Sequence, residues 1–159
     1  MKREEIQNLI KELIEKTTVK ITEITTTDDG QTNTWFSFEV SEPHFFISRE
    51  GEALQALNHL VKRIIETKIN PDGAEDNSAS NVLIDINGFQ KKRIENIRAI
   101  AHMMGERARY FKSSIEVDPM SSFERRVVHE FLSEATDLKT ESVGFGPTRR
   151  VVIKYIGEI

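Results

Sequence analysis

The hydrophobic positions of the chain change spacing several times, and each change predicts a new element. An apolar stripe at helical spacing near the N terminus predicts an amphipathic helix over residues 3–16. Residues 19–27 and 35–40 are rich in β-branched and aromatic side chains and flank the turn sequence Asp28-Asp29-Gly30. They therefore predict an antiparallel hairpin, and Pro43 ends its second strand.

The pattern becomes helical again after a loop. A short apolar segment at residues 45–47, expected to form a short helix, leads into the loop Ser48-Arg49-Glu50-Gly51. A longer helix follows to about residue 68. Its core face is predicted from four residues, which are Leu54, Leu57, Val61 and Ile64. Residues 70–81 are polar and predict a loop, and the alternating residues 82–86 predict a third strand.

The longest helix is predicted over residues 90–112. Its apolar stripe has heptad spacing, and so few heptads favour a helix packed on its own domains over a coiled coil. The stripe consists of Ile94, Ile97, Ala101, Met104, Ala108 and Phe111. The heptad pattern therefore places this helix against the domains on either side of it.

A second set of short elements follows this helix. A strand is predicted at residues 115–117, and further strands at 140–143 and 150–156. Between them, a helix from Ser121 or Ser122 to about residue 133 is expected, with Glu124 completing a capping box. Its inward side chains are predicted to be Val127, Val128, Phe131 and Leu132. The order of elements predicts an α+β fold of two small domains that share the long helix.

Composition narrows the function classes. The 159 residues include 38% hydrophobic residues, no cysteine and no apolar run near the length that spans a bilayer. The N terminus lacks a signal-peptide pattern, so we expect a cytoplasmic protein without a membrane span. The four histidines have no metal-ligand spacing, and no carboxylate pair can be nominated as acid and base. We therefore expect no metal, no cofactor and no catalytic residue.

The net charge of −4 is unevenly distributed along the chain. Residues 1–86 carry −7, residues 87–112 carry +5, residues 113–118 carry −2, and residues 119–159 are neutral. The basic stretch begins with Lys91, Lys92 and Arg93. It is either an ordinary solvated helix face or an anion-binding surface.

Three groups of residues could bind phosphate. The first is Arg125 and His129, which are four residues apart on one helix face. A guanidinium beside an imidazole suits a phosphate there; the alternative is a surface arginine and a half-buried histidine.

The second group is Arg149 and Arg150, which follow a glycine- and proline-containing turn. They are expected to point to opposite faces, so that one reaches a ligand while the other pairs locally. The alternative is a hairpin turn with flanking charges. The loop at Ser48 to Gly51 precedes a helix and could hold a phosphate, or it is only a helix cap.

Several segments together resemble the bacterial Jag family, the SpoIIIJ-associated proteins, which couple a type II KH domain to an R3H domain. Residues 47–61 and 82–93 are similar to the KH half of that family. Residues 116–129, which read EVDPMSSFERRVVH, are similar to the R3H signature, and residues 140–153, TESVGFGPTRRVVI, resemble the closing segment. The similarity runs from about residue 17 to residue 155.

The resemblance implies a KH type II-like domain over residues 1–88, a connecting basic helix over 89–112 and the rest of an R3H domain over 113–159. Many members of the family carry a separate N-terminal domain, whereas we expect this chain to begin almost directly with the KH helix. The resemblance also implies binding of single-stranded RNA, with single-stranded DNA as an alternative ligand, by an RNA chaperone or post-transcriptional regulator. The partner would be RNA, with another KH-domain protein or a second copy of the chain as further candidates.

The resemblance assigns the binding residues to both domains. Arg125 and His129 are the R3H signature pair, Arg149 and Arg150 give basic support, and the KH loop contributes Ser48, Arg49 and Gly51. Ser48 stands where the family has glycine, and Glu50 places a negative charge in the loop. Both departures are expected to weaken phosphate binding there, so we expect binding mainly through the R3H face and the helix that contains Lys91, Lys92 and Arg93.

Two other functions compete with RNA binding. In the first, the acidic KH half is a protein-interaction module. Trp35 would be its anchor if the side chain were exposed, but a core position is favoured for this tryptophan. In the second, the chain is a phosphodiesterase that uses His129 as acid or base. The missing metal ligands and second catalytic group argue against the enzyme.

Overall fold

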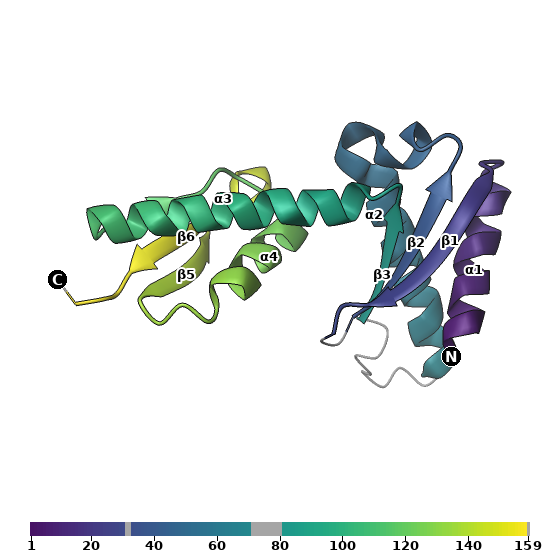
Figure 1. The fold of residues 1–159 in the computed structure, drawn as a ribbon, viewed down its shortest axis with the longest axis horizontal. Helices are drawn as coiled ribbons and strands as arrows, with labels where there is room; N and C mark the ends of the chain where they lie inside the picture. Colours follow the sequence, from purple (N-terminus) through teal and green to yellow (C-terminus); the bar gives the residue numbers. More distant parts are fainter. Residues whose placement is uncertain (31–32, 71–80, 159) are drawn as a thin grey trace. The chain divides into compact units, whose positions relative to one another are not determined.

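The computed structural model describes residues 1–30, 33–70 and 81–158. The chain divides into two compact units, Met1–Lys91 and Lys92–Ile159, which are described separately below. In the described residues, each unit contains one three-stranded sheet with helices packed on it, which confirms the predicted α+β class (Figure 1). The polar segment 70–81 lies almost entirely outside the described residues.

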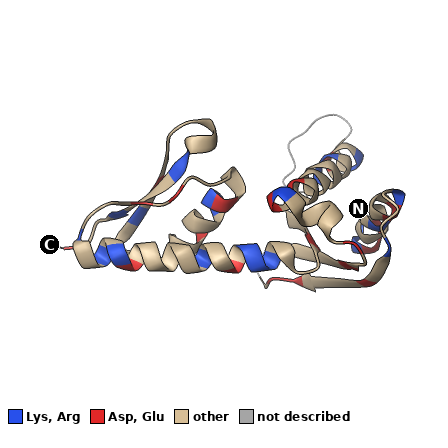
Figure 2. Cartoon of the chain, turned by 90° about the horizontal axis from the view of Figure 1, so that it is seen from above, with Lys and Arg blue, Asp and Glu red and all other residues tan. Residues whose placement is uncertain are grey.

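The first unit consists of α1 (Arg3–Lys16), β1 (Ile21–Asp28), β2 (Thr34–Val40), α2 (His44–Ile69), β3 (Val82–Ile86) and the first residues of α3 (Phe89–Phe111). Strand β2 is central; it pairs antiparallel with β1 and parallel with β3. Helices α1 and α2 cover one face of the sheet (Figure 2). The buried core between them comes from α1, β2, α2 and β3, and includes Ile10, Phe36, Phe38, Leu54 and Ile84; β1 adds only partly buried residues.

Two side chains of this unit bear on predictions made from the sequence, of which one is wrong and one is confirmed. The fourth core residue of α2 is Ile65, which is fully buried, whereas Ile64 is half-buried at the edge. Trp35 points to the other face of the sheet from Phe36 and is nevertheless only 8% exposed. The Lys91 Nζ atom lies 5.5 Å from the centre of its ring, in a cation–π contact. Trp35 is therefore a core residue and not an exposed anchor.

The second unit contains the rest of α3, β4 (Ile115–Glu116), α4 (Ser122–Leu132), β5 (Leu138–Val143), the short 3-10 helix η2 (Gly146–Thr148) and β6 (Arg150–Tyr155). Strand β6 is central, and both β4 and β5 pair with it in antiparallel register. Both helices pack on the same face of this sheet. The core contains Ile97, Ala101 and Ala108 from α3, Val127, Val128 and Leu132 from α4, and Val151 and Ile153 from β6.

Helix α3 approaches the rest of its unit closely because its core residues are small. A side-chain carbon at Gly105 would lie 3.2 Å from Leu138 Cδ1, closer than most such contacts. The heptad stripe therefore describes the inner face of α3 only in part: Ile97, Ala101 and Ala108 are buried, but Phe111 is 60% exposed because it is the last residue of the helix. In α4, Phe131 is 41% exposed, so it is not one of the inward residues.

Candidate functional site

Helix α4 is fixed at its N terminus by local and distant contacts. The predicted capping box is present: the Glu124 amide donates to Ser121 Oγ, and the Ser121 amide donates to Glu124 Oε2. Arg93 of α3 also donates to Glu124, with Nε 2.9 Å from Oε1, and both side chains are mostly buried. Burial alone would raise the pKa of the Glu124 carboxyl, but the hydrogen bonds from Ser121 and Arg93 outweigh it and lower the pKa.

The predicted pair Arg125 and His129 lies on one half-buried face of α4. Arg125 Nη1 donates to the carbonyl of Met120 at 2.6 Å. His129 Nδ1 and Thr140 Oγ1 are 2.7 Å apart and share a hydrogen bond. Desolvation, and next the positive charge of Arg125, lower the pKa of the imidazole. The free protein therefore holds His129 neutral at pH 7, beside a permanent cation.

Strand β5 and the turn after it bring Arg149 to the same face of the sheet. Arg149 Nε donates to Ser142 Oγ at 2.9 Å, and the Met120 amide donates to the Arg149 carbonyl. Thr140 and Ser142 are two residues apart in β5 and pair with the core residues of β6, so their hydroxyls share the helix-covered face. Met120 links Arg149 to Arg125, and the hydroxyls of β5 hold His129 and Arg149.

We refer to Arg125, His129, Arg149, Thr140 and Ser142 as the Arg/His cluster. The two hydroxyl residues were not predicted as site residues, although their spacing of two in a predicted strand indicates a shared face. Arg125 and Arg149 are each anchored through one side-chain nitrogen atom, and their other side-chain N–H groups have no partner in the parts of the chain that the structure describes. The same holds for the Nε2 atom of His129. The cluster can therefore offer several donors to one anionic ligand.

Arg150 lies on the opposite face of the sheet from Arg149. Its Nη1 atom is 3.3 Å from Glu116 Oε2, and on the same outer face Lys154 pairs with Glu141. These cross-strand pairs flank Val152, which is buried although it faces outward. Arg149 is the extended residue just before β6, so the alternation of side chains places it in the cluster and its neighbour Arg150 in a surface ion pair.

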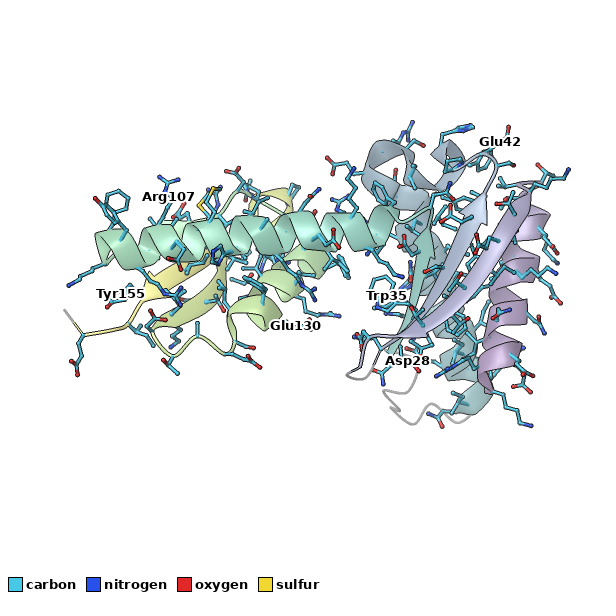
Figure 3. The ribbon with its side chains drawn as sticks, in the orientation of Figure 1. Asp28, Trp35, Glu42, Arg107, Glu130 and Tyr155 are labelled. Atoms are coloured by element: carbon cyan, nitrogen blue, oxygen red, sulfur yellow. The ribbon has the colours of Figure 1, made fainter. Side chains whose placement is uncertain are left out.

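The cations of α3 do not form one continuous basic face. Arg93 is paired with Glu124, and Arg109 donates two hydrogen bonds to Asp137, at 2.7 and 2.9 Å. Arg98 and Arg107 are nine residues apart, which is two and a half turns, so they lie on opposite sides of the helix. Arg107 points away from β5 and β6 (Figure 3), and acidic and uncharged positions separate the cations along the helix (Figure 2).

Lys91 and Lys92, also predicted as site residues, have different environments. Lys91 lies over Trp35 in the first unit, whereas Lys92 is exposed. Of the three consecutive cations that begin the basic stretch, only Lys92 is therefore fully presented to solvent. Arg93 is only 19% exposed at its side chain.

In the first unit, the loop Ser48 to Gly51 interrupts α2. Ser48 is extended, with φ −63° and ψ 159°, and its hydroxyl donates to the His44 carbonyl at 2.6 Å. The next three residues all have left-handed backbone angles, and Arg49 and Glu50 are exposed. At Gly51 a side-chain carbon would lie 2.5 Å from Phe89 Cε1. The loop therefore requires glycine at its last position but accepts serine at its first.

The described residues contain no group of three or more histidine, aspartate or glutamate side chains placed to hold a metal ion. Among the helices that the structure describes, none is both long and apolar enough to cross a membrane.

Comparison with known proteins identifies the second unit. Residues 95–155 match the R3H domain. Over longer stretches the chain is similar to proteins named RNA-binding protein KhpB. The one from Bacillus subtilis is 29% identical over 69% of this chain and 50% of its own length. Those from Lactiplantibacillus plantarum and Clostridium symbiosum are 26% and 25% identical over 79% and 67% of this chain, and over 37% and 45% of their own lengths.

The chain spans at most half the length of these three relatives. The R3H match covers α4, β5 and β6, and so includes every residue of the Arg/His cluster. The predicted resemblance is confirmed to this extent: the chain is similar to proteins named RNA-binding protein KhpB, and its residues 95–155 match the R3H domain.

Proposed function

We propose that this protein binds single-stranded RNA without catalysis, principally through the Arg/His cluster. The observation that carries the proposal is the partial anchoring of Arg125 and Arg149, which fixes both guanidinium groups while leaving N–H donors for phosphate. His129 adds a ring that can stack or donate. The relatives named RNA-binding protein KhpB support RNA as the ligand.

We propose that the first unit is a type II KH-like domain. Its order of helix, two strands, interrupted helix and strand agrees with the resemblance, and the interruption at residues 48–51 takes the place of the family's glycine loop. In this assignment α3 is shared between the KH-like domain and the R3H domain. Arg49 would contact phosphate, and the exposed Glu50 would weaken that contact.

The cellular role that fits these assignments is that of a cytoplasmic RNA chaperone or post-transcriptional regulator. A second KH-domain protein or a second copy of the chain would be its protein partner. Light scattering of the purified protein, with and without RNA, distinguishes this role from the alternative of a protein-interaction module. A tight oligomer whose mass does not change when RNA is added would support the alternative.

The primary test is a filter-binding salt titration on a single-stranded RNA. Arg125→Ala removes a cluster cation, and Arg126→Ala is the matched control because Arg126 is its exposed neighbour on α4. The slope of log affinity against log salt is negative, and its magnitude should decrease by about 0.7 for each RNA phosphate that the variant no longer neutralises. We expect this change for Arg125→Ala and little change for Arg126→Ala.

Two results would contradict the proposal. If both variants keep the affinity and the salt slope of the wild type, the cluster is not the binding site. If the RNA is cleaved in the presence of the protein, and His129→Ala abolishes the cleavage, the chain is an enzyme. Circular dichroism of each variant separates loss of binding from loss of folding.

A further inference from the structure

The turn between β5 and β6 presents an aromatic ring to solvent. Phe145 is 89% exposed, more than any other large hydrophobic side chain in the described parts of the chain. It immediately precedes η2, between Gly144 and Gly146. A single exposed apolar residue is common on protein surfaces, so exposure alone assigns it no role.

The backbone at Phe145 is well fixed, although its ring is exposed. The Phe145 carbonyl accepts hydrogen bonds from Thr148 Oγ1 at 2.8 Å and from the Thr148 amide at 3.3 Å. The Arg149 amide donates to the Gly146 carbonyl at 3.1 Å. The turn therefore holds the backbone from which the ring projects in a defined place, and a phenylalanine has only two side-chain torsions to restrict on binding.

The same turn joins Phe145 to the Arg/His cluster. Gly144 has φ +91°, and a side-chain carbon there would lie 3.3 Å from the Cα atom of Arg149 and 3.4 Å from the Thr148 carbonyl. The chain thus folds back so that the residue before Phe145 packs on the backbone of a cluster arginine. Arg149 is in turn held by Ser142, in the strand that leads into the turn.

An exposed ring beside phosphate-binding cations is the combination by which proteins hold single strands, because every base has a face that can stack on an aromatic ring. We propose that Phe145 is a stacking platform for one unpaired base of the strand whose phosphates the Arg/His cluster binds. This inference rests on the proposed function and adds a base-contacting residue to it. The ligand group is the nucleobase, and the contact tolerates different bases.

The test compares variants of the full chain on an oligoadenylate of about 12 nucleotides, within the usual length of a single-strand site, in a salt titration. Phe145→Ala should weaken binding by about 5- to 150-fold, the range that alanine substitution of stacking residues gives. The salt slope should stay at the wild-type value, because no cation is removed. Phe145→Trp should retain affinity, and its new exposed indole should lose fluorescence when RNA binds, whereas the native Trp35 is buried.

Phe131→Ala is the matched control. Phe131 is an exposed phenylalanine of the same unit, and it lies six residues after Arg125, on a different side of α4. Its removal should leave RNA affinity within about twofold of the wild type.

The outcomes separate the stacking proposal from the proposed function. If Arg125→Ala weakens binding while Phe145→Ala does not, the stacking role is wrong and the cluster remains the binding site. If Phe145→Ala lowers the salt slope as Arg125→Ala does, Phe145 acts only by positioning Arg149, and stacking is again overturned. If the wild-type protein does not bind the oligonucleotide, both proposals fail.

Discussion

Within the loop at residues 48–51, the backbone makes different demands on its first and last residues. Ser48 occupies an ordinary extended conformation, so its replacement of the family's glycine imposes no left-handed strain. Gly51 combines φ +79° with a close approach to the ring of Phe89. The departure at Ser48 therefore leaves the loop geometry accessible, whereas a side chain at Gly51 would disturb both the loop and the start of α3.

We predict that Gly51→Ala destabilises the protein by about 2–4 kcal/mol, from left-handed strain of about 1 kcal/mol and overpacking of about 1–3 kcal/mol. Gly88→Ala is the matched control, because Gly88 has φ +72° but no atom within 4 Å of the added carbon. Its destabilisation should be about 1 kcal/mol. Urea denaturation measures both, and equal destabilisation would show that the contact with Phe89 is unimportant.

His129 gives a second prediction at the residue scale. Because its pKa is lowered in the folded protein, the unfolded chain binds the proton more readily. The contribution of His129 to stability is thus fully present above its ordinary pKa of 6.5 and falls as the pH drops below that value. A bound phosphate favours the charged ring and raises the pKa of His129. RNA affinity should therefore rise as the pH drops through the same range.

The measurement is RNA affinity and unfolding free energy from about pH 8 to about pH 5, which brackets the ordinary histidine pKa, for the wild type and His129→Asn. The variant should show a weaker pH dependence of both quantities. A wild-type affinity that falls with decreasing pH would contradict a phosphate contact by His129.

At the scale of elements, α4 depends on Glu124. This one carboxylate closes the capping box with Ser121 and accepts two hydrogen bonds from Arg93 of α3. It therefore fixes the start of α4 and its position against α3. Because Arg125 directly follows Glu124 and His129 lies on the same helix, the same contact helps to position two of the five residues of the Arg/His cluster.

We predict that Glu124→Gln costs about 1–3 kcal/mol of stability at pH 7, because it leaves the mostly buried Arg93 without its counter-charge. Glu130→Gln on the exposed side of α4 should change stability by less than about 0.5 kcal/mol. The lowered pKa of Glu124 contributes stability above its ordinary value of 4.5 that is lost as the pH falls through the folded pKa. The difference between wild type and Glu124→Gln in urea denaturation should therefore shrink in acid; a constant difference would point to packing alone.

At the scale of the whole molecule, the two units differ in net charge. The first unit has ten lysines and arginines against sixteen acidic residues, and the second has twelve against ten. Arg93, Arg109 and Arg150 are all paired with carboxylates, which neutralise them. The small positive excess of the second unit therefore lies on its other cations, which include Arg125 and Arg149. The overall charge of −4 is therefore compatible with a local cationic site.

This distribution predicts that the loop at residues 48–51 binds RNA less strongly than the Arg/His cluster. Arg49→Ala in the first unit should weaken RNA binding less than Arg125→Ala in the second, because Glu50 and the acidic surroundings oppose phosphate at the first. Glu50→Gln should strengthen binding slightly. Competition titrations of the three variants at one salt concentration give the order, and a larger effect of Arg49→Ala would make the first unit the main site.

Local features were predictable from the sequence. The helices, the hairpin, the capping box at Ser121 and Glu124, and the pairing of Arg125 with His129 on one face all depend on residues within a few positions of one another. Hydrophobic spacing predicts burial wrongly where an apolar residue continues the stripe past the end of the core. Phe111, the last residue of α3, is such a residue and is exposed.

The sequence by itself therefore determined the elements, the α+β class, the family resemblance and most of the candidate cations. Only the tertiary structure decided the distant pairings, because Glu124, the partner of Arg93, and Asp137, one partner of Arg109, are 31 and 28 residues away in the chain. It also decided that Thr140 and Ser142 hold the cluster, that Trp35 is buried and that Phe145 is exposed. These properties depend on which segments meet when the chain folds, and no local spacing specifies that.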